Sequence, residues 1–191
     1  MNRVTNSLDE TSPPIFSSFR DPCGQVYELD GKVYRQIHEA GCENYLKLNK
    51  SGLYDALVLR GFLVKHEEVS LDLALDDRAK IVLRPEKIPL ISYPYEWCFS
   101  QLKDAALLTL EIAKTALEYD MVLKDATAYN IQFLCTKPIL IDTGSFSNYE
   151  EGMPWVAYRQ FCQHFLAPLA LMTFKDIRLG TLSRQYIDGV P

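Results

Sequence analysis

Three oxygen-bearing side chains stand close together in this 191-residue chain and could do chemistry as a group. Asp125 is followed, after four intervening residues, by Asn130, and Asp142 then opens an Asp142-Thr143-Gly144 sequence. A carboxylate can position or deprotonate a hydroxyl group. Carboxylate and amide oxygens are also ligands that Mg²⁺ accepts. The pattern therefore indicates an acid–base residue, Asp125, beside a metal-binding pair, Asn130 and Asp142.

The elements around these residues must bring them to one place. Residues 99–119 are rich in alanine and leucine, lack glycine and proline, and carry an apolar stripe, which predicts a long helix. Two short apolar runs at 131–135 and 139–141, separated by Thr-Lys-Pro, predict a hairpin. This hairpin would return Asp142 to the loop that carries the other two residues. Residues 155–174 resume helical periodicity, and we expect Pro168 to kink or divide that helix.

An Asp, four residues, an Asn that opens a strand, and a second strand ending in Asp-x-Gly resemble the catalytic segment of protein kinases and aminoglycoside phosphotransferases. The resemblance implies Mg²⁺ and ATP as cofactors and an acceptor that the sequence does not identify. Asp125 would position or deprotonate the acceptor, and Asn130 and Asp142 would hold the metal. Taken singly, each residue also has a structural interpretation, because Asp and Asn are favoured in turns.

The first half of the chain has the pattern of a small β-rich unit. Alternating β-prone residues on both sides of an Asp-Gly turn predict a hairpin over 25–37. Leucines and tyrosines at helical spacing predict a helix over 43–62, with a Ser-Gly pair that favours a break. Two more short strands are predicted at 80–83 and 89–93, the first after an acidic stretch expected to be a solvated loop.

A hairpin followed by a helix resembles the small lobe of protein kinases, in which a strand lysine pairs with a helix glutamate. Arg35 stands where that lysine is expected, and Glu43 is the expected partner. Arginine binds phosphate bidentately, although it is not an equivalent replacement for lysine. Tyr95 and Glu96 fall where kinases have the hinge that touches adenine. The resemblance thus implies that these four residues bind the nucleotide; as a simpler alternative, Arg35 is an exposed strand residue.

These patterns predict an α+β fold of the protein-kinase-like type. We expect a flexible arm over 1–20, a small β-rich lobe over 21–94, and a truncated helical large lobe over 95–191. The second lobe carries the catalytic-loop-like segment and is expected to be incomplete.

Several departures from kinases bear on catalysis. Gly24 and Gly31 do not form a glycine-rich phosphate loop, and the usual His-Arg before the catalytic Asp is Leu-Lys. Thr143 stands where an aromatic residue is usual, and only 47 residues follow Gly144. The alternative is therefore a non-catalytic pseudokinase or interaction module.

A second resemblance covers residues 15–191. The run 93–170, with its Lys-Asp-Ala at 124–126 and its Pro-Trp-Val-Ala-Tyr-Arg-Gln-Phe at 154–161, looks like the N-terminal region of bacterial proteins labelled class I SAM-dependent methyltransferases, some related to nodulation proteins. Nothing in the chain matches a SAM-binding glycine loop. The resemblance implies a methyltransferase domain beyond Pro191 as a partner in a longer protein.

The sequence Ile-Leu-Ile-Asp-Thr-Gly-Ser at 139–145 also resembles the aspartic-protease signature, in which two aspartates share a proton. A single copy would require a homodimer with paired Asp142 residues. The long helices expected on both sides of the motif disfavour this interpretation, because aspartic proteases are almost entirely β-structure.

Composition narrows the remaining classes. The chain is 48% hydrophobic and 24% charged with a net charge of −5, so it has a globular composition and no attraction for nucleic acid. No run approaches the length of a membrane span, and the start lacks a signal-peptide pattern. Five cysteines without a Cys-x-x-Cys pair disfavour a disulfide framework or a zinc site, and the three histidines have no ligand spacing. We therefore expect a cytoplasmic protein.

Overall fold

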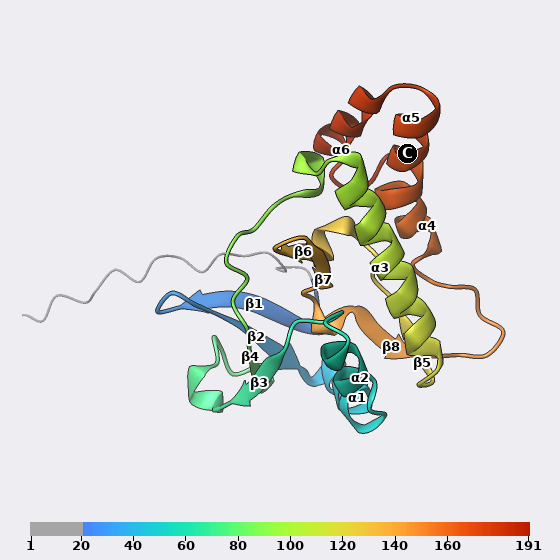
Figure 1. Cartoon of the computed structure of the whole chain (residues 1–191). Coiled ribbons are helices and arrows are strands. Elements are labelled where there is room, and N and C mark those ends of the chain that lie inside the picture. Colours follow the sequence, from blue (N-terminus) through green and yellow to red (C-terminus); the bar gives the residue numbers. More distant parts are fainter. Residues whose placement is uncertain (1–20) are drawn as a thin grey trace, which may run out of the picture.

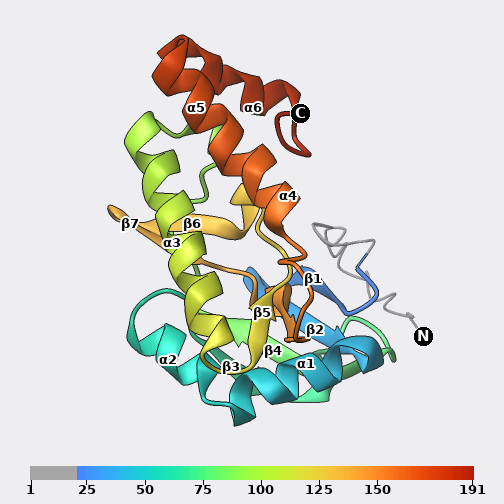
Figure 2. The same ribbon diagram turned by 90° about the vertical axis from the view of Figure 1, so that its right-hand side faces the viewer.

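The computed structural model describes residues 21–191, which form an α+β fold with a sheet-rich N-terminal part (Figure 1). The predicted flexible arm lies outside these residues. In Figures 1 and 2 the hairpin of residues 131–140 lies between the N-terminal sheet and the helices of the second half of the chain. The predicted α+β class, with strands concentrated in the first half, is confirmed.

The N-terminal sheet has the order β1-β2-β4-β3 and is antiparallel throughout. Strands β1 (Gly24–Leu29) and β2 (Lys32–His38) form the predicted hairpin. Its turn residues Asp30 and Gly31 have φ values of 51° and 71°. Such left-handed values match the right-handed twist of the paired strands, which explains why an Asp-Gly pair forms this turn. β2 and β4 are the central strands of the sheet, so a β2 side chain is flanked on both sides.

Two strands complete the sheet. β4 (Ala79–Pro85) contains the predicted strand at 80–83, whereas β3 (His66–Val69) was not predicted. β3 has the sequence His-Glu-Glu-Val, and its charged residues suit an exposed edge strand but give no strand pattern.

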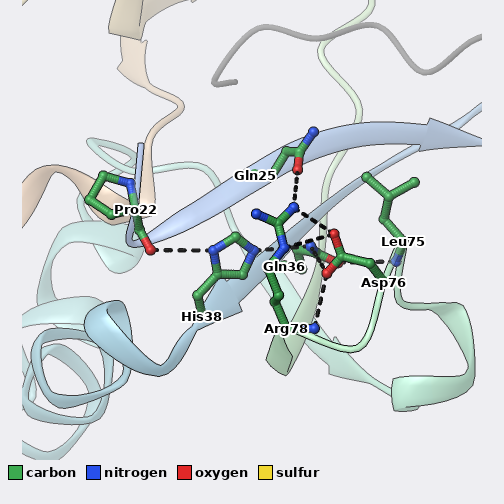
Figure 3. Close-up of polar contacts among 7 residues, drawn as sticks. All are labelled: Pro22, Gln25, Gln36, His38, Leu75, Asp76 and Arg78. Carbon is green, nitrogen blue, oxygen red and sulfur yellow. Dashed lines mark hydrogen bonds and ion pairs between the residues drawn. The ribbon is translucent and has the colours of Figure 1, made fainter. Parts of the chain in front are cut away.

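A polar cluster holds the loop between β3 and β4 against the sheet through Gln36 of β2 (Figure 3). The Gln36 side-chain amide donates to Asp76 Oδ1 at 3.0 Å and lies 3.0 Å from His38 Nε2. Arg78 donates to Asp76 Oδ2 at 2.6 Å and to the Gln25 amide oxygen at 3.4 Å. The acidic stretch expected to be a solvated loop is therefore anchored to a buried strand residue.

The predicted helix at 43–62 is two helices, α1 (Glu39–Lys50) and α2 (Leu53–Leu59), which break at the expected Ser-Gly pair. Gly52 has a φ of 85°, a left-handed conformation that a residue with a side chain rarely adopts. Leu48, Leu53 and Leu57 are fully buried in one core with residues of the C-terminal half. These two helices therefore join the sheet to the rest of the molecule.

The strand predicted at 89–93 is wrong: this segment is an irregular linker between β4 and the long helix. At Ser92, a side chain takes the hydrogen bonds that a neighbouring strand would otherwise make. The backbone N–H of Ser92 donates to Gln132 Oε1 at 2.9 Å, and Gln132 Nε2 donates to the Ser92 carbonyl at 3.0 Å.

The long helix α3 (Phe99–Leu117) confirms the prediction for 99–119. The predicted second hairpin is also confirmed as β6 (Ile131–Leu134) and β7 (Lys137–Leu140). β5 (Met121–Leu123) and β8 (Phe146–Asn148) pair with each other and were not predicted. Each has three residues, too few for a periodic pattern.

The C-terminal helices are α4 (Tyr158–Phe161), α5 (Ala167–Phe174) and α6 (Leu182–Gln185). A π-helical turn, Cys162–Leu166, joins α4 to α5 directly before Pro168. Proline lacks the N–H that would continue the α-helical ladder, which agrees with the predicted irregularity at this point. Within residues 21–191 there is no helix of the length and apolarity required to cross a membrane.

Candidate functional site

Arg35 and Asp142 form an ion pair across the interface between the sheet and the β6–β7 region. Arg35 lies in the middle of β2, opposite Val26 of β1 and Leu83 of β4. Its side chain is 14% exposed and that of Asp142 is 16% exposed. Both charges are thus largely shielded from water, and each is neutralised by the other.

Further contacts fix the Asp142 carboxylate. The backbone N–H of Gly144 donates to Oδ1 at 2.9 Å, and the Ser145 hydroxyl donates to Oδ2 at 2.8 Å. A Cβ at position 144 would lie 2.7 Å from Arg35 Nη1 and 3.2 Å from Asp142 Oδ1. The glycine of the Asp-x-Gly motif therefore leaves room for the guanidinium.

Asn130 joins the same set of contacts through Ser145. Its side-chain nitrogen donates to the Ser145 hydroxyl oxygen at 3.2 Å. The backbone N–H of Ile141 also donates to the Asn130 carbonyl at 2.9 Å, which holds the loop against the end of β7. We call Arg35, Asp142, Ser145 and Asn130 the site network. Ser145 was not predicted as a site residue, although its place directly after Asp-x-Gly was visible in the sequence.

Asp125 begins the loop that leads to Asn130. The backbone N–H of Lys124 donates to the Ser145 carbonyl at 2.8 Å and extends the β5–β8 ladder, so Asp125 follows a residue bonded to the site network. Asp125 Oδ1 accepts from the backbone N–H of Thr127 at 3.1 Å, an arrangement that tightens the loop.

The π-helical turn packs against this loop. Gln160, in α4, accepts from the backbone N–H of Ala126 at 2.6 Å, and buried His164 lies 3.4 Å from the Thr127 hydroxyl. The ring of Tyr129 meets the His164 ring edge-on, with centroids 6.1 Å apart. Burial lowers the pKa of His164, and the nearby carboxylates of Asp125 and Asp188 oppose this shift. His164, which has no metal-ligand spacing in the sequence, thus supports the predicted catalytic loop.

Three of the predicted nucleotide-binding residues lie away from the site network. Glu43 is exposed on α1 and accepts a hydrogen bond from Asn148 at 2.9 Å, while Arg35 is ion-paired with Asp142. Tyr95 and Glu96 lie in a 3₁₀ turn before α3, where Glu96 accepts from the backbone N–H of Tyr93. The turn packs against α6. The expected Arg35–Glu43 pair is absent from the ion pairs among residues 21–191.

A cavity of about 350 Å³ lies further along β2, between 31–33, 65–67 and 84–87. Val33 lines it and shares a sheet face with Arg35, because side chains two apart in a strand point the same way. Four cationic residues line it, Lys32, Lys65, Arg84 and Lys87, together with the acidic Glu67 and Glu86. Arg84 is ion-paired with Glu67. Glu86 and Lys87 directly follow β4, so the linker segment at the cavity is this one and not Tyr95-Glu96.

The donor set fits magnesium. Asp142 and Asn130 both contact Ser145 and offer hard oxygen atoms, and Mg²⁺ commonly takes one or two protein oxygens together with substrate phosphates. No group of three or more His, Cys, Asp or Glu side chains is arranged to hold a metal in the described part of the chain. A metal there would need phosphate oxygens or water to complete its shell.

No family model matches the chain. The chain is 36% identical over 179 residues to "Nodulation protein NoeA" of Rhizobium meliloti (strain 1021), a match that covers 93% of this chain and 37% of the relative. This agrees with the predicted resemblance to nodulation-related proteins. Because the chain spans about a third of that relative's length, the relative's whole-protein properties do not transfer directly.

Among solved structures, the chain is similar to vaccinia related kinase 3, with a TM-score of 0.40 and 14% sequence identity. The match covers 70% of this chain and 47% of the kinase chain. A TM-score of this size supports no argument about the site, so the geometry of the site network carries the functional inference.

Proposed function

We propose that this chain is a kinase-like domain that binds Mg-ATP and transfers phosphate to a small-molecule or protein acceptor. The observation that carries the proposal is the site network, which joins Arg35 of β2 to Asp142 and Asn130 from the loops around the β6–β7 hairpin. These are the residue types that phosphoryl transfer requires: a cation for phosphate and oxygen ligands for magnesium. Asp125, at the start of the adjoining loop, would position the acceptor hydroxyl.

The proposed nucleotide position is the cavity further along β2, where Val33 lies on the same sheet face as Arg35. Its volume of about 350 Å³ is within the range of small-ligand pockets. Val33 and Pro85 supply apolar walls for a base. The lining has four cationic and two acidic residues, an excess of two positive charges that suits a polyanion. The bound magnesium would neutralise phosphate charge, while Arg35 has further N–H donors to offer to phosphate oxygens.

Calorimetric titration of ATP with and without Mg²⁺ tests the binding step. We expect magnesium to tighten binding of the wild-type chain by about tenfold or more, and Asp142→Asn to abolish that gain. Asp176→Asn is the matched control, because Asp176 pairs with Arg178 at a distant surface. Equal binding with and without magnesium, or no binding, would overturn the proposal.

Phosphate transfer needs a separate test. Single-turnover measurement of γ-phosphate loss from ATP, in the presence of candidate acceptors, should show a large decrease in rate for Asp125→Asn. An unchanged phosphate yield in this variant would remove Asp125 from catalysis. We further propose a cytoplasmic location, which agrees with all five cysteines being free thiols.

A non-catalytic pseudokinase module of a longer methyltransferase-type protein is the second candidate. The observation that favours it is the exchange of partners: Arg35 holds Asp142 while Glu43 bonds Asn148, so the cation–glutamate pair of active kinases is not formed. The greater length of the nodulation-related relative also agrees with it. A natural gene product that continues past Pro191 into a SAM-binding domain, together with absent ATP binding, would favour this candidate.

A further inference from the structure

Ser145 occupies a buried position at the centre of the site network. The residue is fully buried. Its carbonyl accepts from the backbone N–H of Lys124 at 2.8 Å, and its own N–H donates to the Asp142 carbonyl at 3.3 Å. Because the backbone is held on both sides, the hydroxyl oxygen has little freedom to move relative to Asp142 and Asn130.

The direction of each hydrogen bond at this hydroxyl follows from chemistry. An ionised carboxylate can only accept, so the single Ser145 proton is donated to Asp142 Oδ2, at 2.8 Å. The Ser145 oxygen then has only lone pairs left for Asn130, whose amide nitrogen lies 3.2 Å away. If the Asn130 amide were rotated by 180°, two oxygen lone pairs would face each other with no proton between them.

The geometry points to Ser145 as a positioning residue that orients the Asn130 amide and the Asp142 carboxylate so that both present oxygen to the same divalent cation. The expected effect on metal binding rests on the proposed Mg-ATP function. The orientation of the Asn130 amide by Ser145 rests on the contacts of the three side chains alone. With the Asn130 nitrogen held by Ser145, Oδ1 is directed away from Ser145 and is available as a hard ligand.

Removal of the hydroxyl should therefore affect metal binding more than nucleotide binding. In Ser145→Ala, the side-chain nitrogen of Asn130 and Oδ2 of Asp142 both lose a partner. The amide is then free to rotate and to present N–H groups to the cation, which repel it. Asp142 keeps its contacts with Arg35 and the Gly144 N–H, so metal-free ATP binding should weaken less than magnesium-dependent binding.

The first readout uses no ligand. In ¹⁵N-labelled protein, the side-chain amide signals of Asn130, assigned by their loss in Asn130→Asp, report whether the group is fixed. We expect Ser145→Ala to shift these signals and speed their exchange with water. Thr109→Val is the matched control, because it deletes a buried hydroxyl that bonds the Ala105 carbonyl in α3. Unchanged Asn130 signals in Ser145→Ala would overturn the inference.

The second readout is the ratio of ATP affinities with and without Mg²⁺. We expect Ser145→Ala to reduce this ratio about tenfold, and the double variant with Asn130→Ala to lose little more, because both act on one ligand. Losses that add would contradict the inference. If Ser145→Ala does not fold, Ser145→Cys retains a weak donor and serves for both readouts. If the wild-type chain binds no Mg-ATP, the proposed function fails, while the amide signals still decide the role of Ser145.

Discussion

Replacement of Arg35 by methionine is the sharpest test of how the two halves of the site are held together. Methionine keeps most of the length and apolar volume of the side chain and removes its charge. The Asp142 carboxylate would then lie at 16% exposure without its cationic partner. It would keep the hydrogen bonds from the Gly144 N–H and the Ser145 hydroxyl.

The expected magnitude lies between two limits. Breaking a fully buried pair by removal of one partner costs about 3–5 kcal/mol, whereas an exposed pair contributes about 0–1 kcal/mol. Because Arg35 and Asp142 are mostly shielded and Asp142 retains two donors, we expect a loss of about 2 kcal/mol in the free energy of unfolding. For a chain of this size, such a loss lowers Tm by about 4–8 °C.

Urea unfolding of a double-mutant cycle with Asp142→Asn measures the coupling directly. We expect the two single losses in unfolding free energy to sum to a larger value than the loss in the double variant. The difference, which is the coupling energy, should be at least about 1 kcal/mol. Arg84→Met is the control, because Arg84 pairs with Glu67 on the same sheet but both side chains are more than a third exposed. Additive losses for Arg35 and Asp142, or an equal effect of Arg84→Met, would refute the argument that the shielded pair joins the sheet to the hairpin.

Three further predictions concern pH and packing. Burial lowers the pKa of His66 to about 4, so the folded chain resists protonation and wild-type stability should fall between about pH 6.5 and pH 4. In His66→Gln the urea midpoint should fall less over this range, and an equal fall would contradict the prediction; buried His164, whose pKa is also lowered, accounts for part of the remaining slope. The hydrogen bond from Arg78 is the largest cause that lowers the pKa of Asp76 to about 2, so its contribution is full above about pH 4 and lost towards pH 2. Asp76→Asn should therefore be less stable at pH 7 and equal to wild type near pH 2, and a constant difference would contradict this. Gly24→Ala should lower Tm by an amount corresponding to about 1–3 kcal/mol, because its Cβ would meet the carbonyl oxygen of Gln36 on the paired strand; an unchanged melting curve would contradict it.

The parts of the fold that the sequence predicted are those fixed by local signals. An Asp-Gly pair between alternating residues is sufficient for the β1–β2 hairpin, since the turn chemistry and the strand pattern lie within one short segment. The same holds for α3, whose composition and apolar stripe indicate a helix without reference to the remainder of the chain.

The missed strands depend on partners distant in sequence. β5 and β8 have three residues each and become strands because Leu123 pairs with Phe146 across the whole β6–β7 hairpin. β3 is polar on its exposed side and pairs only with β4. In the linker, Gln132 takes the place of a neighbouring strand, which no pattern within 89–93 reveals.

The site illustrates the same division between local and distant information. The sequence predicted that Asn130 and Asp142 lie close together, because only a short hairpin separates them. Both side chains do bond to Ser145. The partner of Arg35 could not be obtained in this way. An expectation taken from kinases assigned it to Glu43, whereas the docking of α1 beside β8 gives Glu43 a different neighbour, Asn148.

The pairing of Arg35 with Asp142 reduces the number of carboxylate positions that a metal ion can use. An ionised carboxylate offers about four lone-pair positions. In Asp142, Arg35 and the Gly144 N–H take positions on Oδ1 and the Ser145 hydroxyl takes one on Oδ2. Little of the carboxylate is left for a cation, and part of its charge is already neutralised by the guanidinium. Mg²⁺ alone should therefore bind weakly, because it would gain one oxygen from Asp142 and one from Asn130 while needing six in near-octahedral geometry. A polyphosphate supplies the missing oxygens and also gives the remaining Arg35 donors an acceptor, so metal and nucleotide should bind with positive cooperativity at this site.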